Sequence, residues 1–218
     1  HSVLHTNTPF GGVATPWTRP LDMILVMASY LSPASADITY RLLLASAWVP
    51  VLFGVMAAFV MTRAARLCFD TRLADVIVVF LCLIPAFQMS TIMGSLFIAG
   101  MTDHHGLLSL LWCGALYTIL SDRTVKAQMA LGLILGLMLW ISPEGLMLWI
   151  IVYGAMAIDV FYHPSSIRQA VPVSLIAALT VTAGLLVEQP VQDIFTNPPM
   201  YDTLSLPYVV LAWVIAIA

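Results

Sequence analysis

A carboxylate and two imidazoles stand in a row, at Asp103, His104 and His105, directly before an apolar run that begins at Gly106. If the chain approaches this run in an extended conformation, residues two apart face the same way, so Asp103 and His105 can grip one cation. A carboxylate with an imidazole suits Mn²⁺, Zn²⁺ or a similar divalent ion, whereas Mg²⁺ and Ca²⁺ prefer more oxygen ligands. The triplet therefore predicts part of a metal site, which ligands from elsewhere in the chain must complete.

A second interpretation of the same triplet needs no metal. Asp103 can cap a helix that begins at Gly106, with the two histidines at the level of the lipid headgroups. Capping does not exclude metal binding, because the amino-terminal end of a helix dipole also favours anionic ligands. The triplet by itself leaves both interpretations open.

The rest of the chain avoids charge. Of its 218 residues 61% are hydrophobic and 9% are charged, and the mean hydropathy is +0.98. Soluble domains carry about a quarter charged residues, so the composition excludes that class and predicts an integral membrane protein. Cys68, Cys82 and Cys113 form no CxxC pair and lie in apolar surroundings. We interpret them as packing residues rather than as disulfides or metal ligands.

Apolar runs long enough to cross a bilayer recur along the chain. A spanning helix needs about 20 mostly apolar residues, which predicts an all-α polytopic transmembrane bundle of about seven spans: 40–62, 73–89, 106–120, 127–142, 145–161, 170–187 and 207–218. Residues 21–32 are apolar but too short to cross, so we expect an interfacial helix there. Residues 1–39, with the interfacial helix, then precede the transmembrane bundle of residues 40–218, and we expect the chain to continue beyond both ends.

The basic residues predict the orientation of this bundle. Six of the eight fall in connections on one side, which the positive-inside rule makes cytoplasmic: Arg63, Arg66, Arg72, Arg123, Lys126 and Arg168. Seven of the eleven acids fall on the other side: Asp22, Asp37, Asp103, Glu144, Glu188, Asp193 and Asp202. We therefore expect any chemistry on the extracytoplasmic face, although outer loops also become acidic simply because basic residues are excluded from them.

Several segments resemble, in their order and spacing, a known family of membrane enzymes. They are residues 5–12, residues 16–22 with Trp17-Thr18-Arg19-Pro20, residues 102–106 with the Asp-His-His triplet, and residues 139–145. The family is the GT-C superfamily of glycosyltransferases, in its part related to the catalytic subunit of oligosaccharyltransferase, especially the archaeal enzymes and uncharacterised bacterial relatives. The resemblance covers most of the chain. It implies a GT-C-like bundle, in a bacterial inner membrane, with its active face extracytoplasmic.

The resemblance also implies a reaction and a site. The reaction is metal-dependent transfer of a sugar or oligosaccharide from a polyprenyl phosphate or diphosphate to an acceptor that the sequence does not identify. Asp103 and His105 would hold a divalent cation, Mn²⁺, Mg²⁺ or Zn²⁺, with Asp103 also catalytic and His104 binding substrate. The cation would offset the negative charge of the leaving phosphate. The expected partners are the lipid-linked donor, the acceptor and the bilayer, and not nucleic acid.

Other outer residues are candidates for the same site. Glu144 stands at an outer span boundary, where it can be a base for an acceptor hydroxyl, a partner of a ligand or a helix-start acid. Arg19 can clamp the donor phosphate in a bidentate way or reach toward lipid headgroups. Trp17 is a further substrate-binding candidate, although interface packing also explains it. Tyr201 and Asp202 lie in an outer loop and are candidates for acceptor contact.

Two other classes of function stay open at the level of sequence. An ion- or proton-coupled transporter would place ionisable residues near the midplane, commonly at broken helices within inverted repeats. The centres of the predicted spans contain almost none, and no internal repeat is evident. The other class is a non-catalytic subunit of a membrane complex.

Overall fold

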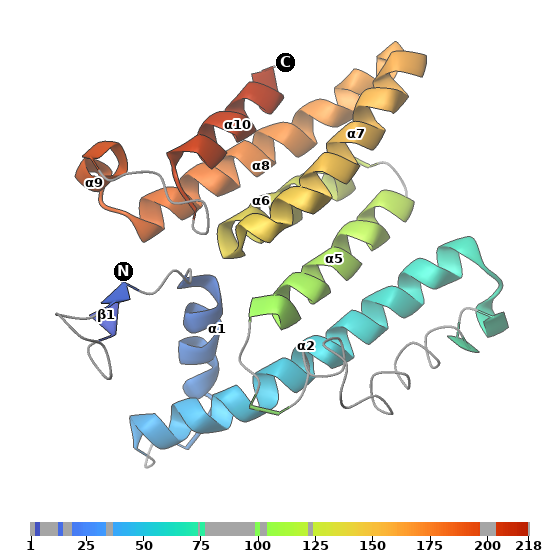
Figure 1. The fold of residues 1–218 in the computed structure, drawn as a ribbon. Coiled ribbons are helices and arrows are strands. Elements are labelled where there is room, and N and C mark those ends of the chain that lie inside the picture. The colour runs from blue at the N-terminus through green and yellow to red at the C-terminus, as the bar shows by residue number, and fades with distance from the viewer. Residues whose placement is uncertain are drawn as a thin grey trace. The chain divides into compact units, whose positions relative to one another are not determined.

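A computed structural model describes residues 3–4, 13–14, 19–33, 37–73, 75–76, 99–100, 104–121, 124–196 and 204–217. These residues are almost entirely helical (Figure 1), which confirms the predicted all-α class. The exception in this part of the chain is a two-residue antiparallel pair between β1 (Val3–Leu4) and β2 (Val13–Ala14). The chain divides into two compact units, which we call the amino-terminal unit (Pro20–Ile134) and the carboxy-terminal unit (His1–Arg19 with Leu135–Ala218).

The amino-terminal unit is built around two helices that pack along each other, α2 (Ile38–Cys68) and α5 (His104–Leu120). Helix α2 begins where the Asp37 side chain accepts a hydrogen bond from the Thr39 N–H at 3.2 Å. Its buried face repeats every four residues at Ala45, Val49, Phe53 and Ala57. Small residues on such a face let two helix backbones approach closely, as membrane helices do. The short helix α1 (Arg19–Ser29) precedes α2.

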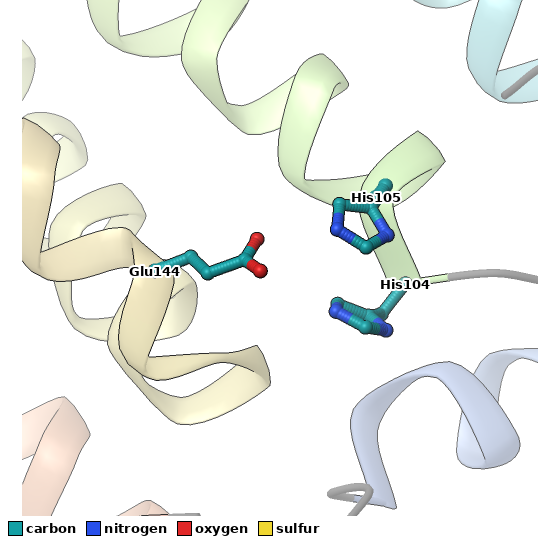
Figure 2. A group of neighbouring side chains, drawn as sticks. All are labelled: His104, His105 and Glu144. Atoms are coloured by element: carbon teal, nitrogen blue, oxygen red, sulfur yellow. The ribbon is translucent and has the colours of Figure 1, made fainter. Parts of the chain in front are cut away.

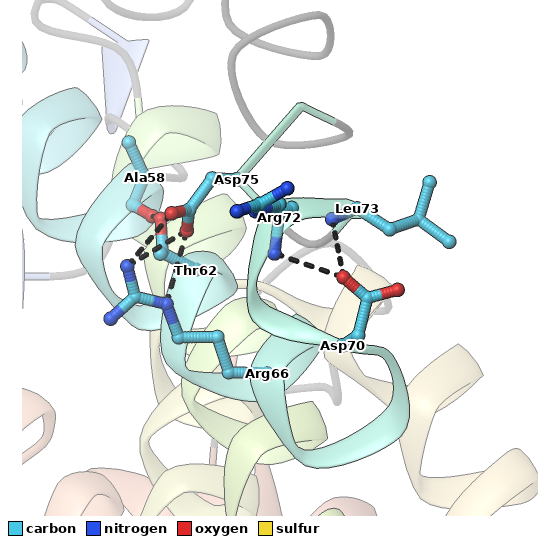
Figure 3. Close-up of polar contacts among 7 residues, drawn as sticks. All are labelled: Ala58, Thr62, Arg66, Asp70, Arg72, Leu73 and Asp75. Atoms are coloured by element: carbon cyan, nitrogen blue, oxygen red, sulfur yellow. Dashed lines mark hydrogen bonds and ion pairs between the residues drawn. The ribbon is translucent and has the colours of Figure 1, made fainter.

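A charged corner follows the end of α2 (Figure 3). Arg66 donates to Asp75 Oδ1 from Nε at 3.0 Å and from Nη2 at 2.8 Å. The Asp70 carboxylate accepts from the backbone N–H groups of Arg72 and Leu73, at 3.0 and 3.1 Å. Both partners of the ion pair are close to half exposed, so we expect the pair to contribute about 1 kcal/mol or less to stability. The corner fixes the local path of the chain.

The carboxy-terminal unit contains the end of α6 (Val125–Ile141), η1 (Pro143–Gly145), α7 (Leu146–Tyr162), η2 (Pro164–Ser166), α8 (Ile167–Glu188), α9 (Val191–Thr196) and α10 (Leu206–Ile217). Helices α8 and α10 lie side by side (Figure 1), and Trp213 Nε1 on α10 donates to Thr182 Oγ1 on α8 at 3.0 Å. Helices α6 and α8 meet at Gly136, where an added Cβ would lie 2.4 Å from Thr180 Cβ. Only glycine permits so close a contact.

Within the part of the chain that the structure describes, three helices are long and apolar enough to cross a membrane: Ile38–Cys68, Pro143–Tyr162 and Pro164–Glu188. They correspond to the predicted spans 40–62, 145–161 and 170–187. Helices α5 and α6 have 17 residues each, which is about 26 Å against a hydrocarbon core of about 30 Å. Helix α10 is shorter still, and most of the predicted span 73–89 lies outside the described residues. The prediction of about seven spans is therefore not confirmed. Helix α1 begins and ends close to the predicted interfacial helix 21–32.

Candidate functional site

His104 and His105 open helix α5, and their rings lie against each other (Figure 2). The ring centroids are 4.2 Å apart with planes inclined at 30°, and a ring nitrogen of each lies within 4.8 Å of one on the other. Both side chains are half-buried, and the next residues, Gly106, Leu107 and Leu108, are buried. The buried turn anchors the start of the helix. The two imidazoles can therefore present nitrogen ligands to a single divalent ion.

Spacing alone predicts a pair that includes Asp103, and that pair stays a prediction. The sequence pairs Asp103 with His105, because residues two apart share a face in an extended chain. The helix already begins at His104, and the pair seen in the structure is His104 with His105. Asp103 lies outside the described residues, as do Trp17, Tyr201 and Asp202. Arg19 begins α1, but its side chain is not among those that the structure describes.

Glu144 belongs to the carboxy-terminal unit, in the middle of the η1 turn. Ser142 precedes the turn in an extended conformation, and its Oγ accepts from the Glu144 N–H at 3.3 Å. Pro143 occupies the first position, where its missing N–H costs nothing. The Glu144 side chain is exposed and extends away from the turn (Figure 2). The predicted turn at 142–145 is thus present, and the Glu144 carboxylate that it carries is exposed.

The turn that carries Glu144 rests directly on the last turns of α6. Gly145 is buried, and an added Cβ would lie 2.7 Å from the carbonyl carbon of Met138 and 2.9 Å from the backbone nitrogen of Leu139. Just beyond the turn, the buried Trp149 donates from Nε1 to the Leu135 carbonyl at 2.9 Å. Contacts on both sides therefore fix the backbone of the turn against α6.

A second contact holds the end of α6 to the end of α8. Trp140 Nε1 donates to Glu188 Oε1 at 2.9 Å, and Glu188 is 7% exposed. Gly184 lies under the indole, since an added Cβ would be 2.7 Å from the Trp140 ring. Glu188 is one of the acids predicted for the outer face, and the sequence assigns it no role. The structure makes Glu188 a buried acceptor for Trp140, which lies four residues before Glu144 in the chain.

Replacing Trp140 by Phe is expected to lower the free energy of unfolding by about 1–3 kcal/mol, because the buried Glu188 loses a hydrogen-bond donor. Trp213→Phe is the matched control. It removes the indole hydrogen bond to the hydroxyl of Thr182, which lies on α8 as Glu188 does, and we expect a smaller loss of about 0.5–1.5 kcal/mol. Thermal or denaturant unfolding of both variants in lipid nanodiscs measures the difference. Equal losses of unfolding free energy in the two variants would show that the contact with Glu188 stabilises the fold no more than the contact with Thr182.

Arg41 is a basic residue to which the sequence pattern assigns no role. It lies in the first turn of α2, with its guanidinium carbon 5.3 Å from the centroid of the Tyr30 ring. Its Nε is buried and has no hydrogen-bond partner in the part of the chain that the structure describes. The signal was present in the sequence, since Arg19 and Arg41 are the two basic residues that fall outside the predicted cytoplasmic connections.

Comparison with solved structures identifies the fold. The crystal structure of the Archaeoglobus fulgidus oligosaccharyltransferase in complex with Zn and sulfate is similar at 20% sequence identity and a TM-score of 0.65, over 94% of this chain and 27% of that one. The apo form is similar at 18% identity and a TM-score of 0.67, over 94% and 26%. The form tethered with an acceptor peptide containing the NVT sequon is similar at 19% and 0.64, over 94% and 26%.

No protein-family model matches the sequence, and neither does any curated protein. The chain spans about a quarter of the length of the solved chains that it resembles. At this level of identity the likeness concerns the fold and not the activity. The expected resemblance is confirmed to that extent: this chain has the fold of a part of the archaeal oligosaccharyltransferase.

Proposed function

We propose that this chain is the part of a membrane glycosyltransferase that binds a divalent cation and a lipid-linked sugar donor. The whole enzyme would transfer a sugar or oligosaccharide from a polyprenyl phosphate or diphosphate to an acceptor. The proposal places the protein in a bacterial inner membrane with the active face extracytoplasmic. One observation carries it: a half-buried histidine pair opens a helix in a chain with the fold of an oligosaccharyltransferase. That the similar structure was solved with Zn supports a metal in this role.

The proposed ligands are Asp103 and His105, with His104 beside them, and Glu144 is proposed separately as a base for an acceptor hydroxyl. His104 and His105 each offer one ring nitrogen, a ligand atom of a kind that holds Zn²⁺ or Mn²⁺. A set with two imidazoles suits these ions better than Mg²⁺, which prefers oxygen. When bound, the cation would supply Lewis-acid stabilisation of the leaving phosphate.

The chain's own residues have the remaining tasks in this proposal. Arg19 is proposed to clamp the donor phosphate, because a guanidinium can donate two parallel hydrogen bonds to it. Trp17 is proposed to contact the donor, and Tyr201 and Asp202 the acceptor. His104 is proposed to donate from the ring nitrogen that does not face the cation, which would orient the donor.

The distribution of charge favours this enzyme over a transporter. The long helices carry no Asp, Glu, Lys, Arg or His over residues 42–62, 145–158 and 169–187. A coupled transporter needs ionisable side chains at such depths. Ionisable groups gather instead at helix ends, where a lipid-linked substrate exposes its sugar to water.

The experiment that tests the proposal is transfer from a labelled polyprenyl-linked sugar by the full-length protein in nanodiscs. We expect EDTA to abolish transfer and added Mn²⁺ or Zn²⁺ to restore it. Asp103→Ala should lower transfer by more than about 100-fold, since losing even a partner of a metal ligand costs about 10- to 100-fold. Asp193→Ala, which removes another predicted outer acid, is the control and should retain activity. Transfer that survives both EDTA and Asp103→Ala would disprove the metal mechanism.

A further inference from the structure

Helix α2 contains a proline inside it, Pro50. Proline has no backbone N–H, so the carbonyl four residues earlier, that of Ser46, receives no helical hydrogen bond from position 50. In this structure that carbonyl accepts from the backbone N–H of Gly100 at 3.1 Å. A gap in the hydrogen bonding of one helix is thus filled by a residue from a distant part of the chain.

Glycine is required at position 100 by the backbone conformation rather than by crowding. Its φ is +87°, in the region that L-residues rarely adopt. An added Cβ would meet nothing within 4 Å, so crowding is not the reason. The positive φ belongs to the turn that aims the Gly100 N–H at α2. Asn tolerates positive φ better than other residues with side chains, and it would therefore preserve the turn better than Ala.

The attachment lies four residues before the histidine pair. Before His104 in the chain, the Gly100 N–H donates a hydrogen bond to α2. After His105, the buried residues Gly106 and Leu107 belong to α5, which packs along α2. Pro50 itself is buried, as is the neighbouring Val49. All of these residues belong to the amino-terminal unit. The two imidazoles are therefore held between two attachments to a single helix.

We propose that Pro50 and Gly100 are positioning residues for the histidine metal site: Pro50 frees the Ser46 carbonyl, and Gly100 docks the chain before His104 onto it. The inference rests on the proposed function, because it assigns these residues to the same cation site. Neither residue contacts the ion. They act by restricting the path of the chain that carries its ligands.

Mn²⁺ titration of the full-length protein in nanodiscs, followed by electron paramagnetic resonance, tests the proposal. Pro50→Ala restores an N–H that lets α2 close its own hydrogen bond to Ser46, and we expect Mn²⁺ affinity to fall by about 10- to 100-fold. The melting temperature is not expected to fall, because Ala is a far better helix former than Pro. A loss of affinity without a loss of stability separates positioning from a merely structural role.

A second pair of variants tests the other end of the contact. Gly100→Ala should weaken Mn²⁺ binding to a similar degree, and Gly100→Asn should recover part of the affinity. The matched controls are Pro172→Ala inside α8 and Gly154→Ala in α7, where an added Cβ meets nothing within 4 Å. Both controls should bind Mn²⁺ like the wild type.

The outcomes distinguish this inference from the function on which it rests. Wild-type affinity in both Pro50→Ala and Gly100→Ala would overturn the inference and leave the metal site standing. A wild-type protein that binds neither Mn²⁺ nor Zn²⁺ would instead overturn the proposed function. Equal losses in Pro172→Ala and Pro50→Ala would also overturn the inference, because the effect would then follow from any helix proline.

Discussion

His105→Ala and His104→Ala are each expected to weaken Mn²⁺ or Zn²⁺ binding by more than about 100-fold, a larger effect than the 10- to 100-fold typical of residues that only orient a ligand. The sequence suggests His105 as a ligand and His104 as a substrate contact. The structure places the two rings 4.2 Å apart with nitrogens close enough to share an ion, which predicts ligand behaviour for both. Metal titration and transfer kinetics on both variants measure the effect.

The two roles of His104 leave different kinetic signatures. If His104 is a ligand, His104→Ala loses metal affinity and transfer together. If it only contacts the donor, the KM for the donor rises while metal affinity stays at the wild-type level. His163→Ala is the matched control, because His163 is an exposed histidine at the end of α7, 3.2 Å from Asp159. A His104→Ala protein with wild-type metal affinity would leave His104 with the substrate-binding role that the family resemblance implies.

Gly145→Ala is expected to lower the free energy of unfolding by about 1–3 kcal/mol, as overpacking of a well-packed site does. The backbone angles at Gly145, φ −55° and ψ −21°, suit alanine, so conformation is not the obstacle. The obstacle is contact, because the new Cβ would lie 2.7 Å from the Met138 carbonyl carbon and 2.9 Å from the Leu139 nitrogen. Both are backbone atoms, so they cannot move aside as the end of a side chain can.

The same substitution tests whether the Glu144 turn matters for transfer. Moving the turn off α6 shifts the Glu144 backbone, so we expect transfer to fall further than the loss of folded protein explains. Thermal unfolding together with transfer per folded molecule separates the two effects. Gly154→Ala is the control, since its Cβ meets open space and it should change neither quantity. Wild-type stability in Gly145→Ala would contradict the packing described for the turn.

The sequence by itself determined the membrane class, the three long helices and the turn before Glu144. These features depend on local properties: the length of an apolar run, and a Ser-Pro pair that starts a turn. It also pointed to the oligosaccharyltransferase fold, through motifs that keep their order along the chain. Each of these features can be predicted from the sequence because none of them depends on contacts with residues far away along the chain.

The tertiary structure decided which side chains meet. Spacing predicts that Asp103 and His105 face one way, which stays a prediction, whereas the ring contact between His104 and His105 is visible only in the folded helix α5. Periodicity gave no sign that the buried Glu188 accepts from Trp140. Pro50 falls inside the single predicted span 40–62, and only the folded structure shows that the Ser46 carbonyl, which Pro50 leaves without a helical hydrogen bond, accepts from Gly100. Such contacts depend on how helices pack, and the pattern of one segment does not contain that information.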